Sequence, residues 1–326
     1  MTVLVTGGAG YIGSHTVRTL VATGSPVVVL DTLELGRADS VIGAELVVGD
    51  VVDEALVETI CRDHDVTAVV HFAAYKNVGE SMREPGKYWL NNIAGTVHLI
   101  EASTRAGVER LVFSSSCSVN GTPPSVPVTE DQPIHPESVY AETKAIVERI
   151  LDWYRVTRGL SSVSLRYFNA AGASSDGAIG EDWSYSQNLI PLAMRSLLVG
   201  EPVLRVFGDD YPTPDGTCIR DYIHVEDLAG AHVKALEYLE RGGTTTAINV
   251  GTGVGSSVLE VLHTIEAVAG RQVPHEVVAR RAGDPVATYA DPTLAAELLG
   301  WKASHGLAEI VSTAYQWHSA QATNPR

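Results

Sequence analysis

The feature that most constrains the fold is a regular alternation, over the first half of the chain, of short apolar runs with longer amphipathic segments. The runs lie at 2–6, 27–30, 45–48, 68–72, 110–115 and 161–168, and the segments with helical spacing lie at 11–22, 53–63, 87–106 and 140–158. Because the runs are apolar throughout, both faces of each strand are expected to be buried. The sequence therefore predicts an α/β protein with a doubly wound parallel sheet covered by helices.

The pattern changes after Asn169, where loop-rich stretches replace the alternation. Residues 246–251, TAINVG, again look like a buried strand that returns to the sheet. We therefore expect a nucleotide-binding domain over residues 1–168, with segments near 225–255 returning to it. A smaller C-terminal substrate-binding α/β region would then consist mainly of residues 169–326.

A glycine-rich turn joins the first predicted strand to the first predicted helix. Gly7, Gly10 and Gly13 have the spacing G-x-x-G-x-x-G, which lets a backbone approach a pyrophosphate while the helix N-terminus offers free N–H groups. Asp31 closes the second strand, where a carboxylate can accept hydrogen bonds from an adenosine ribose and disfavours the extra phosphate of NADP. A Rossmann-type NAD site is predicted, and the alternative is an ordinary turn with a surface Asp.

Tyr140 and Lys144 lie four residues apart in SVYAETK, on one face of a predicted helix. In isolation such a pair is usually an ordinary surface tyrosine and lysine. Ionising a free tyrosine at neutral pH costs roughly 4 kcal/mol, but a nearby ammonium and a positive nicotinamide ring both stabilise the phenolate. The hydroxyls of residues 114–116 end the fifth predicted strand, at the sheet edge where ligands bind. The pattern therefore predicts a catalytic tyrosine beside the cofactor.

Composition excludes several partners. The 39 acidic and 23 basic residues leave a formal charge of -16, which disfavours binding to nucleic acid or anionic lipid. Cys61, Cys117 and Cys218 are too few and too widely spaced for a disulfide framework or a metal site. The N-terminus lacks the pattern of a signal peptide, and no apolar run approaches the ~18 residues that span a bilayer. We expect a cytoplasmic protein without a metal, a nucleic-acid partner or a membrane partner.

Further segments, added to these motifs, resemble the extended short-chain dehydrogenase/reductase family over nearly the whole chain. They are VLVTGGAGYIGSH, GD at 49–50, VVHFAAYKNVGES, NNIAGT, FSSSCSV, SVYAETK, LRYFNAAGA, FGDDYPTPDGTCIRDYIHVEDLA, NVGTG and RRAGDP. The resemblance is closest to the sugar-nucleotide epimerases of that family. It implies reversible NAD-dependent 4-epimerisation of UDP-glucose and UDP-galactose through a 4-keto intermediate, in galactose metabolism. Acceptance of N-acetylated UDP-hexosamines would follow if the pocket at Thr288 is open.

The resemblance also implies the roles of individual residues. Tyr140 would be the base, Lys144 its partner, and Ser116 a hydrogen-bonding partner of the sugar 4-hydroxyl. The implied cofactor residues, besides Tyr140 and Lys144, are Gly7, Gly10, Tyr11, Ile12, Gly13, Asp31, Asp50, Val51, Phe72, Ala73, Lys76, Asn91, Ser114 and Phe168. The implied substrate residues, besides Ser116, are Asn169, Asn188, Leu189, Phe207, Arg220, Tyr222, Arg281, Asp284 and Thr288. A homodimer formed through helices near 87–106 and 140–158 is implied as well.

Some features depart from the family pattern or fit another activity. Asn120 stands where the family usually has tyrosine, and the segment 32–49 is short, which leaves its contacts with adenosine unassigned. A dehydratase would carry Asp-Glu where this chain has Cys117-Ser118, and a decarboxylase of UDP-glucuronate matches DYPTPDGTCIRDYIHV less well. A non-catalytic NAD-binding sensor is disfavoured by the Ser-Tyr-Lys set.

Three other polar positions are assigned no chemistry. His71 and His224 are expected to be structural, the first at a strand end and the second in a loop or at a helix start. The acidic pair at 181–182 is expected to be solvated surface.

Overall fold

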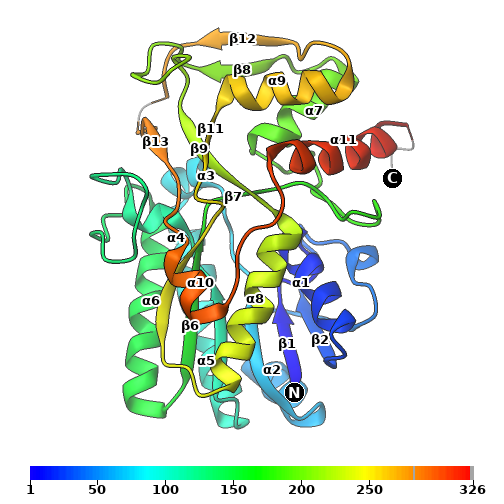
Figure 1. The fold of residues 1–326 in the computed structure, drawn as a ribbon. Coiled ribbons are helices and arrows are strands. Elements are labelled where there is room, and N and C mark those ends of the chain that lie inside the picture. Colours follow the sequence, from blue (N-terminus) through cyan, green and yellow to red (C-terminus); the bar gives the residue numbers. More distant parts are fainter. Residues whose placement is uncertain (282, 324–326) are drawn as a thin grey trace.

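The computed structural model describes residues 1–281 and 283–323 of the chain. Its centre is a seven-stranded sheet in the order β10-β6-β5-β4-β1-β2-β3, in which every neighbouring pair is parallel (Figure 1). The strands are β1 (Thr2–Thr6), β2 (Val27–Asp31), β3 (Glu45–Val48), β4 (Val66–His71), β5 (Arg110–Ser114), β6 (Ser161–Tyr167) and β10 (Thr246–Val250). The predicted doubly wound parallel sheet is confirmed, and its strand order reverses between β1 and β4.

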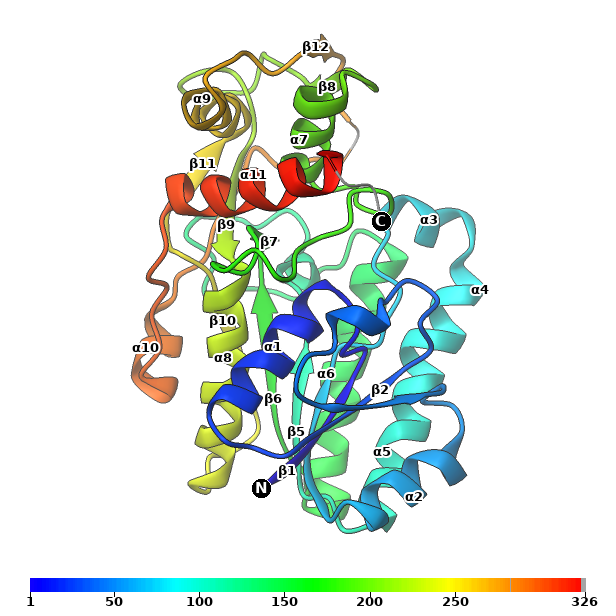
Figure 2. The same cartoon turned by 90° about the vertical axis from the view of Figure 1, so that its right-hand side faces the viewer.

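Helices cover both faces of this sheet. On one face α1 and α8 lie side by side, and α2, α5 and α6 cover the other (Figures 1 and 2). These helices are α1 (Tyr11–Ala22), α2 (Glu54–Asp63), α5 (Gly95–Arg105), α6 (Val139–Arg158) and α8 (Val225–Glu240). Within β1, Val3 and Val5 pack toward α1 and α8, whereas Leu4 packs toward α2, α5 and α6. Both faces of the strand are therefore apolar, which explains the continuous apolar runs.

The segment predicted as a helix over 87–106 is helical, with a π-helical stretch inside it. It contains α4 (Pro85–Tyr88), a π-helical stretch over Trp89–Ala94, and α5. In the widened turn, Asn92 accepts a hydrogen bond from the main-chain nitrogen of Tyr75 at 2.9 Å and donates one to its carbonyl oxygen at 2.9 Å. The predicted helix is therefore confirmed, but it is not α-helical throughout, because the wider turn accommodates a side chain that contacts a distant loop.

A smaller region lies above the carboxyl ends of the sheet strands (Figure 1). Its strands are β7 (Asn169–Ala171), β9 (Ile219–His224), β11 (Gly255–Ser257) and β13 (Ala287–Thr288) around β9, and the separate pair β8 (Leu204–Phe207) and β12 (His275–Val278). Its helices are α7 (Leu189–Val199), α9 (Val258–Ala269) and α11 (Leu307–Thr323), which share one apolar core, while α10 (Thr293–Leu299) packs beside α8. The remaining short elements are α3 (Val78–Arg83) and the 3-10 turns Ala38–Ser40 and Cys117–Asn120.

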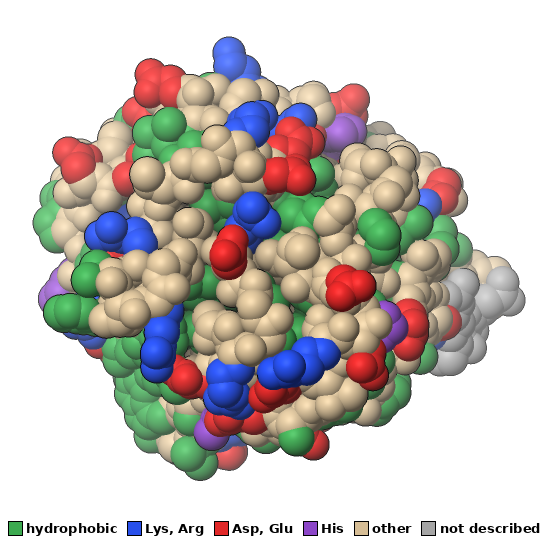
Figure 3. All heavy atoms as spheres, turned by 90° about the horizontal axis from the view of Figure 1, so that it is seen from below, with side chains coloured by type: hydrophobic (Ala, Val, Ile, Leu, Met, Phe, Trp, Pro, Cys, Tyr) green, Lys and Arg blue, Asp and Glu red, His purple; other side chains and the backbone are tan. Residues whose placement is uncertain are grey.

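Charged groups of both signs are interspersed over the face at the amino ends of the strands (Figure 3). Among the helices of the described chain, none combines the length and the apolar content that crossing a bilayer requires.

Candidate active site

The glycine turn packs against the turn that follows β4, at the point where the strand order reverses. Gly7 has φ of 71°, and a Cβ on it would lie 2.6 Å from the main-chain nitrogen of Ala73. A Cβ on Gly13 would lie 2.2 Å from the carbonyl oxygen of Gly7. The helix α1 begins at Tyr11 without a side-chain cap. Glycine is therefore required for this tightly packed turn, and the uncapped first-turn N–H groups of α1 can bind a phosphate group.

Asp31 ties the loop after β2 to the glycine turn. Its Oδ2 accepts a hydrogen bond from the main-chain nitrogen of Ala9 at 2.9 Å, and its Oδ1 accepts one from that of Leu33 at 2.9 Å. The predicted Asp31 and glycine positions thus lie together at the carboxyl edge of the sheet. Each carboxylate oxygen retains a lone pair that a ribose hydroxyl could use.

Tyr140 and Lys144 lie on the buried side of the first turns of α6. Ser138 caps this helix by accepting a hydrogen bond from the main-chain nitrogen of Ala141. The Lys144 ammonium donates to the carbonyl oxygen of Ser114 at 2.7 Å and lies 5.8 Å from the centre of the Tyr140 ring. The cap fixes the start of α6 and so places Tyr140 in its first turn. Lys144, one turn later, reaches the carboxyl end of β5.

Burial controls the protonation of both groups. Burial, with a smaller contribution from Tyr167, raises the pKa of Tyr140 well above its usual value, and a hydrogen bond with Ser116 opposes this rise. Burial lowers the pKa of Lys144 from 10.5 to about 7, and the negative charge of Glu148 opposes this change. The protein groups alone therefore keep the phenol protonated, and the phenolate requires an additional positive charge nearby.

The three serines after β5 contact different partners. Ser114 shares a hydrogen bond with the hydroxyl of Tyr167 at 2.9 Å, and Ser115 donates to Glu148 at 2.5 Å. Ser116 is the serine that contacts Tyr140, and its Oγ also accepts a hydrogen bond from the main-chain nitrogen of residue 118 at 3.2 Å. Of the hydroxyls predicted as a cluster, the one at Ser116 is thus placed beside the tyrosine.

The other predicted cofactor residues lie around these turns. The Tyr11 hydroxyl donates to the carbonyl oxygen of residue 172 at 2.7 Å, and the Phe72 ring packs against His232 at 4.6 Å. Asn91 donates to Asn92 at 2.9 Å, and Asp50 accepts from the main-chain nitrogen of residue 52 at 3.2 Å. Ile12 and Val51 belong to the cores on opposite faces of the sheet, and Phe168 packs in a small separate cluster with Val128 and Ala290.

Four predicted substrate residues form one cluster in the smaller region. Arg281 donates to Asp284 at 3.0 Å, and Arg220 lies 3.9 Å from the same carboxylate. The Arg281 guanidinium carbon lies 5.1 Å from the centre of the Phe207 ring. Two guanidinium groups and an aromatic ring can bind a diphosphate and a flat base.

Two further pairings involve predicted substrate residues. Thr288 of β13 pairs with Arg220 of β9, and Asn169 of β7 pairs with Tyr222 of β9. Leu189 is the first residue of α7, directly after Asn188.

Glu181 was expected to be solvated, and this prediction is wrong. Its side chain is buried, and Oε1 accepts hydrogen bonds from Ser186 at 2.8 Å and from Asn188 at 2.9 Å. Lys76 lies 3.5 Å from the same oxygen. Nothing in the surrounding polar loop distinguishes this carboxylate in the sequence.

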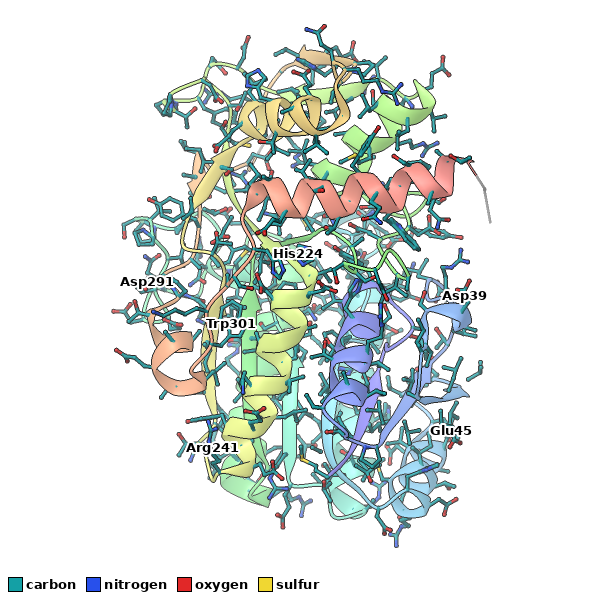
Figure 4. All side chains as sticks on the ribbon, turned by 45° about the vertical axis from the view of Figure 1, so that its right-hand side comes forward. Asp39, Glu45, His224, Arg241, Asp291 and Trp301 are labelled. Atoms are coloured by element: carbon teal, nitrogen blue, oxygen red, sulfur yellow. The ribbon has the colours of Figure 1, made fainter. Side chains whose placement is uncertain are left out.

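The two histidines have structural positions, as expected. His71 is buried and bonded to Thr6 at 2.6 Å, and burial lowers its pKa to about 3. His224 lies at the start of α8 beneath α11 and accepts a hydrogen bond from the main-chain nitrogen of Glu226 (Figure 4). His224, Glu226 and His305 are close enough to hold an ion, but both ring nitrogens of His224 already have protein partners, the second being Thr313 at 3.0 Å.

Known proteins resemble this chain over nearly its full length. Residues 3–251 match the model of the NAD dependent epimerase/dehydratase family. The UDP-glucose 4-epimerase of Lactobacillus helveticus is 45% identical over 322 residues, which cover 98% of both chains.

Solved structures agree with this match. UDP-glucose 4-epimerase from Brucella ovis in complex with NAD is 46% identical, with a TM-score of 0.96 and 98% of both chains covered. UDP-glucose-4-epimerase from Stenotrophomonas maltophila, with bound NAD and formylated UDP-arabinopyranose, is 41% identical, with a TM-score of 0.96 and 99% of both chains covered. The family prediction is confirmed: the chain belongs to the NAD dependent epimerase/dehydratase family.

Proposed function

We propose that this protein is a UDP-glucose 4-epimerase that interconverts UDP-glucose and UDP-galactose through a 4-keto sugar. The observation that carries the proposal is the convergence of Tyr140, Lys144 and Ser116 at the sheet edge that also carries the glycine turn. The sequence identity to named UDP-glucose 4-epimerases supports the choice of reaction within the family.

The residues present fit NAD. Gly7 and Gly13 leave no space for a Cβ, which permits the tight turn, and α1 starts without a side-chain cap, so its first-turn N–H groups would bind a pyrophosphate. Asp31 would hold the adenosine ribose, and Lys144 and Tyr140 would lie at the nicotinamide end. NAD would accept and return the hydride and would add a positive charge near the phenol.

In the proposed mechanism, Ser116 orients the sugar 4-hydroxyl and Tyr140 takes its proton. Lys144 stabilises the phenolate, which the protein alone disfavours. Arg220 and Arg281 would hold the diphosphate while the keto sugar turns over. Tyr140 would then return the proton to the 4-oxygen as the hydride is returned to the opposite face of C4. The sugar undergoes no net oxidation in this reaction.

The proposal also covers domain roles and assembly. Residues 1–168, with segments near 225–255, would bind NAD, and the rest of 169–326 would bind the UDP-sugar.

We expect a homodimer through α5 and α6, because Trp153 and Val156 on α6 expose 67% and 64% of their surface. Light scattering after gel filtration would test this assembly.

The decisive experiment incubates purified protein with UDP-galactose, without added reductant, and measures UDP-glucose. Equilibration of the two sugars is expected, and the Tyr140→Phe protein is the matched control. Release of a dehydrated or decarboxylated product would instead assign a different activity within the family.

A further inference from the structure

The carboxylate of Glu181 connects the two halves of the proposed site. Its Oε1 is shared by Lys76, predicted to contact the cofactor, and by Asn188, predicted to contact the substrate. The main-chain carbonyl of Glu181 accepts a hydrogen bond from the indole of Trp317 on α11 at 2.9 Å. The residue is therefore fixed by three separate segments of the chain.

A carboxylate determines how an amide beside it is oriented. Ionised Glu181 can only accept hydrogen bonds, so Asn188 must turn its NH2 group toward it. That NH2 group has two hydrogens, of which Glu181 takes one and leaves the other for a second acceptor. The hydroxyl of Ser186 supports the arrangement, because it donates to Glu181 at 2.8 Å and accepts from the main-chain nitrogen of Asn188 at 3.1 Å.

The second carboxylate oxygen of Glu181, Oε2, also indicates that this side chain does more than stabilise the fold. Oε2 is buried and has no hydrogen-bond partner among the described residues. A buried carboxylate oxygen without a partner costs free energy that a neutral, isosteric amide would reduce.

We propose that Glu181 is a positioning residue that fixes the Asn188 amide so that its second N–H donates to the diphosphate of the UDP-sugar. The proposal rests on the proposed function for the identity of the ligand. Without the carboxylate, the Asn188 amide can turn over and present its oxygen to the diphosphate, which repels it.

Glu181→Met tests the proposal, because methionine has a similar length but offers no strong acceptor, whereas the Oε1 of a glutamine could still accept from both Asn188 and Ser186. We expect Glu181→Met to weaken UDP binding to the NAD-loaded protein about tenfold, by calorimetry, since the hydrogen bond that orients the Asn188 amide is lost. The KM for UDP-galactose should rise in parallel, with a smaller change in kcat. The control is Asp182→Asn, which removes the neighbouring charge but no contact with Asn188. Its UDP affinity should stay within about twofold of the wild-type value.

A double-mutant cycle separates positioning from a general effect on folding. If Glu181 acts through Asn188, Glu181→Met should change UDP affinity about twofold or less in an Asn188→Ala background. An equal loss in both backgrounds would overturn the proposal, and so would wild-type UDP affinity in Glu181→Met. If Glu181→Met lowers the yield of folded protein, Asn188→Ala alone must still weaken UDP binding for the proposal to stand.

The outcomes also distinguish this proposal from the proposed function. A wild-type protein that binds UDP through Glu181 and Asn188 but forms no UDP-glucose would contradict the epimerase and leave the positioning role intact. A wild-type protein that does not bind UDP would contradict the positioning role.

Discussion

The side-chain nitrogen of Lys144 lies 5.8 Å from the centre of the Tyr140 ring, on the same buried face of α6. This arrangement puts a cation near a phenol without a direct ion pair, while burial disfavours the charged form of each group. The cofactor's positive ring would therefore decide when the tyrosine can act as a base.

Replacing Tyr140 with Phe should reduce turnover of UDP-galactose by about a hundredfold to ten-thousandfold, because only the titrating oxygen is removed. NAD affinity should change little, since the ring and its packing remain. Turnover and NAD titration are measured on the same preparation. Near-normal turnover would contradict the role of Tyr140 as the base.

The lowered pKa of Lys144 makes a prediction about stability without NAD. Between pH 7 and 10.5 the unfolded chain binds a proton at this lysine that the folded chain does not, so the free energy of unfolding should rise with pH there. Relative to Lys144→Met, wild type should gain about 2 kcal/mol between about pH 7 and pH 9. Urea unfolding of both proteins at both pH values measures this difference, in which other titrating groups cancel. A flat difference would show that Lys144 keeps its ordinary pKa in the folded protein.

Gly13→Ala should destabilise the protein strongly, because its Cβ would lie 2.2 Å from the carbonyl oxygen of Gly7. The free energy of unfolding should fall by roughly several kcal/mol, because a rigid main chain cannot move away from the added methyl group. Gly86→Ala in α4 is the matched control, because a Cβ there meets no atom within 4 Å. Thermal unfolding compares the two variants, and equal melting temperatures would argue against a rigid turn.

Asp31→Ala should weaken NAD binding about tenfold and reduce the discrimination against NADP, since two main-chain N–H groups lose their acceptor and the repulsion of a 2′-phosphate disappears. Titration of cofactor-free protein with both dinucleotides measures the ratio. Asp39→Ala, in the same loop, serves as a control for loss of charge. A wild-type preference for NADP would contradict the assignment of Asp31.

The sheet and the positions of its turns could be predicted because continuous apolar runs determine parallel strands, and parallel strands bring their carboxyl ends together. The π-helical turn could not, because it depends on the contact between Asn92 and the main chain of Tyr75. The burial of Glu181 could not be predicted for the same reason. It depends on contacts with Lys76, Asn188 and Trp317, which come from separate segments, and no local sequence pattern indicates that these residues are close together. Local sequence thus indicates which residues could react, whereas long-range contacts decide how they are held.

The last prediction concerns the breadth of the sugar pocket. Thr288 pairs with Arg220 across β13 and β9, and its half-buried side chain is small. The adjacent Tyr289 has its ring beside Gly255, with Cδ1 3.0 Å from the position that a Cβ there would take. Tyr289 follows the end of β13, and because its ring lies beside Gly255 we expect it not to fill the volume that Thr288 leaves open.

We therefore expect UDP-galactose to be the main substrate and UDP-N-acetylgalactosamine a measurable second one. Thr288→Tyr should abolish the second activity and largely spare the first, because a filled pocket rejects added bulk by steric clash. Thr288→Ser, which keeps the pocket open, is the matched control and should retain both activities. Chromatographic separation of the epimers measures both reactions. If wild type equilibrates the plain hexoses rapidly but turns over neither N-acetylated sugar, the pocket is closed by another residue, and Tyr289→Ala would then identify it.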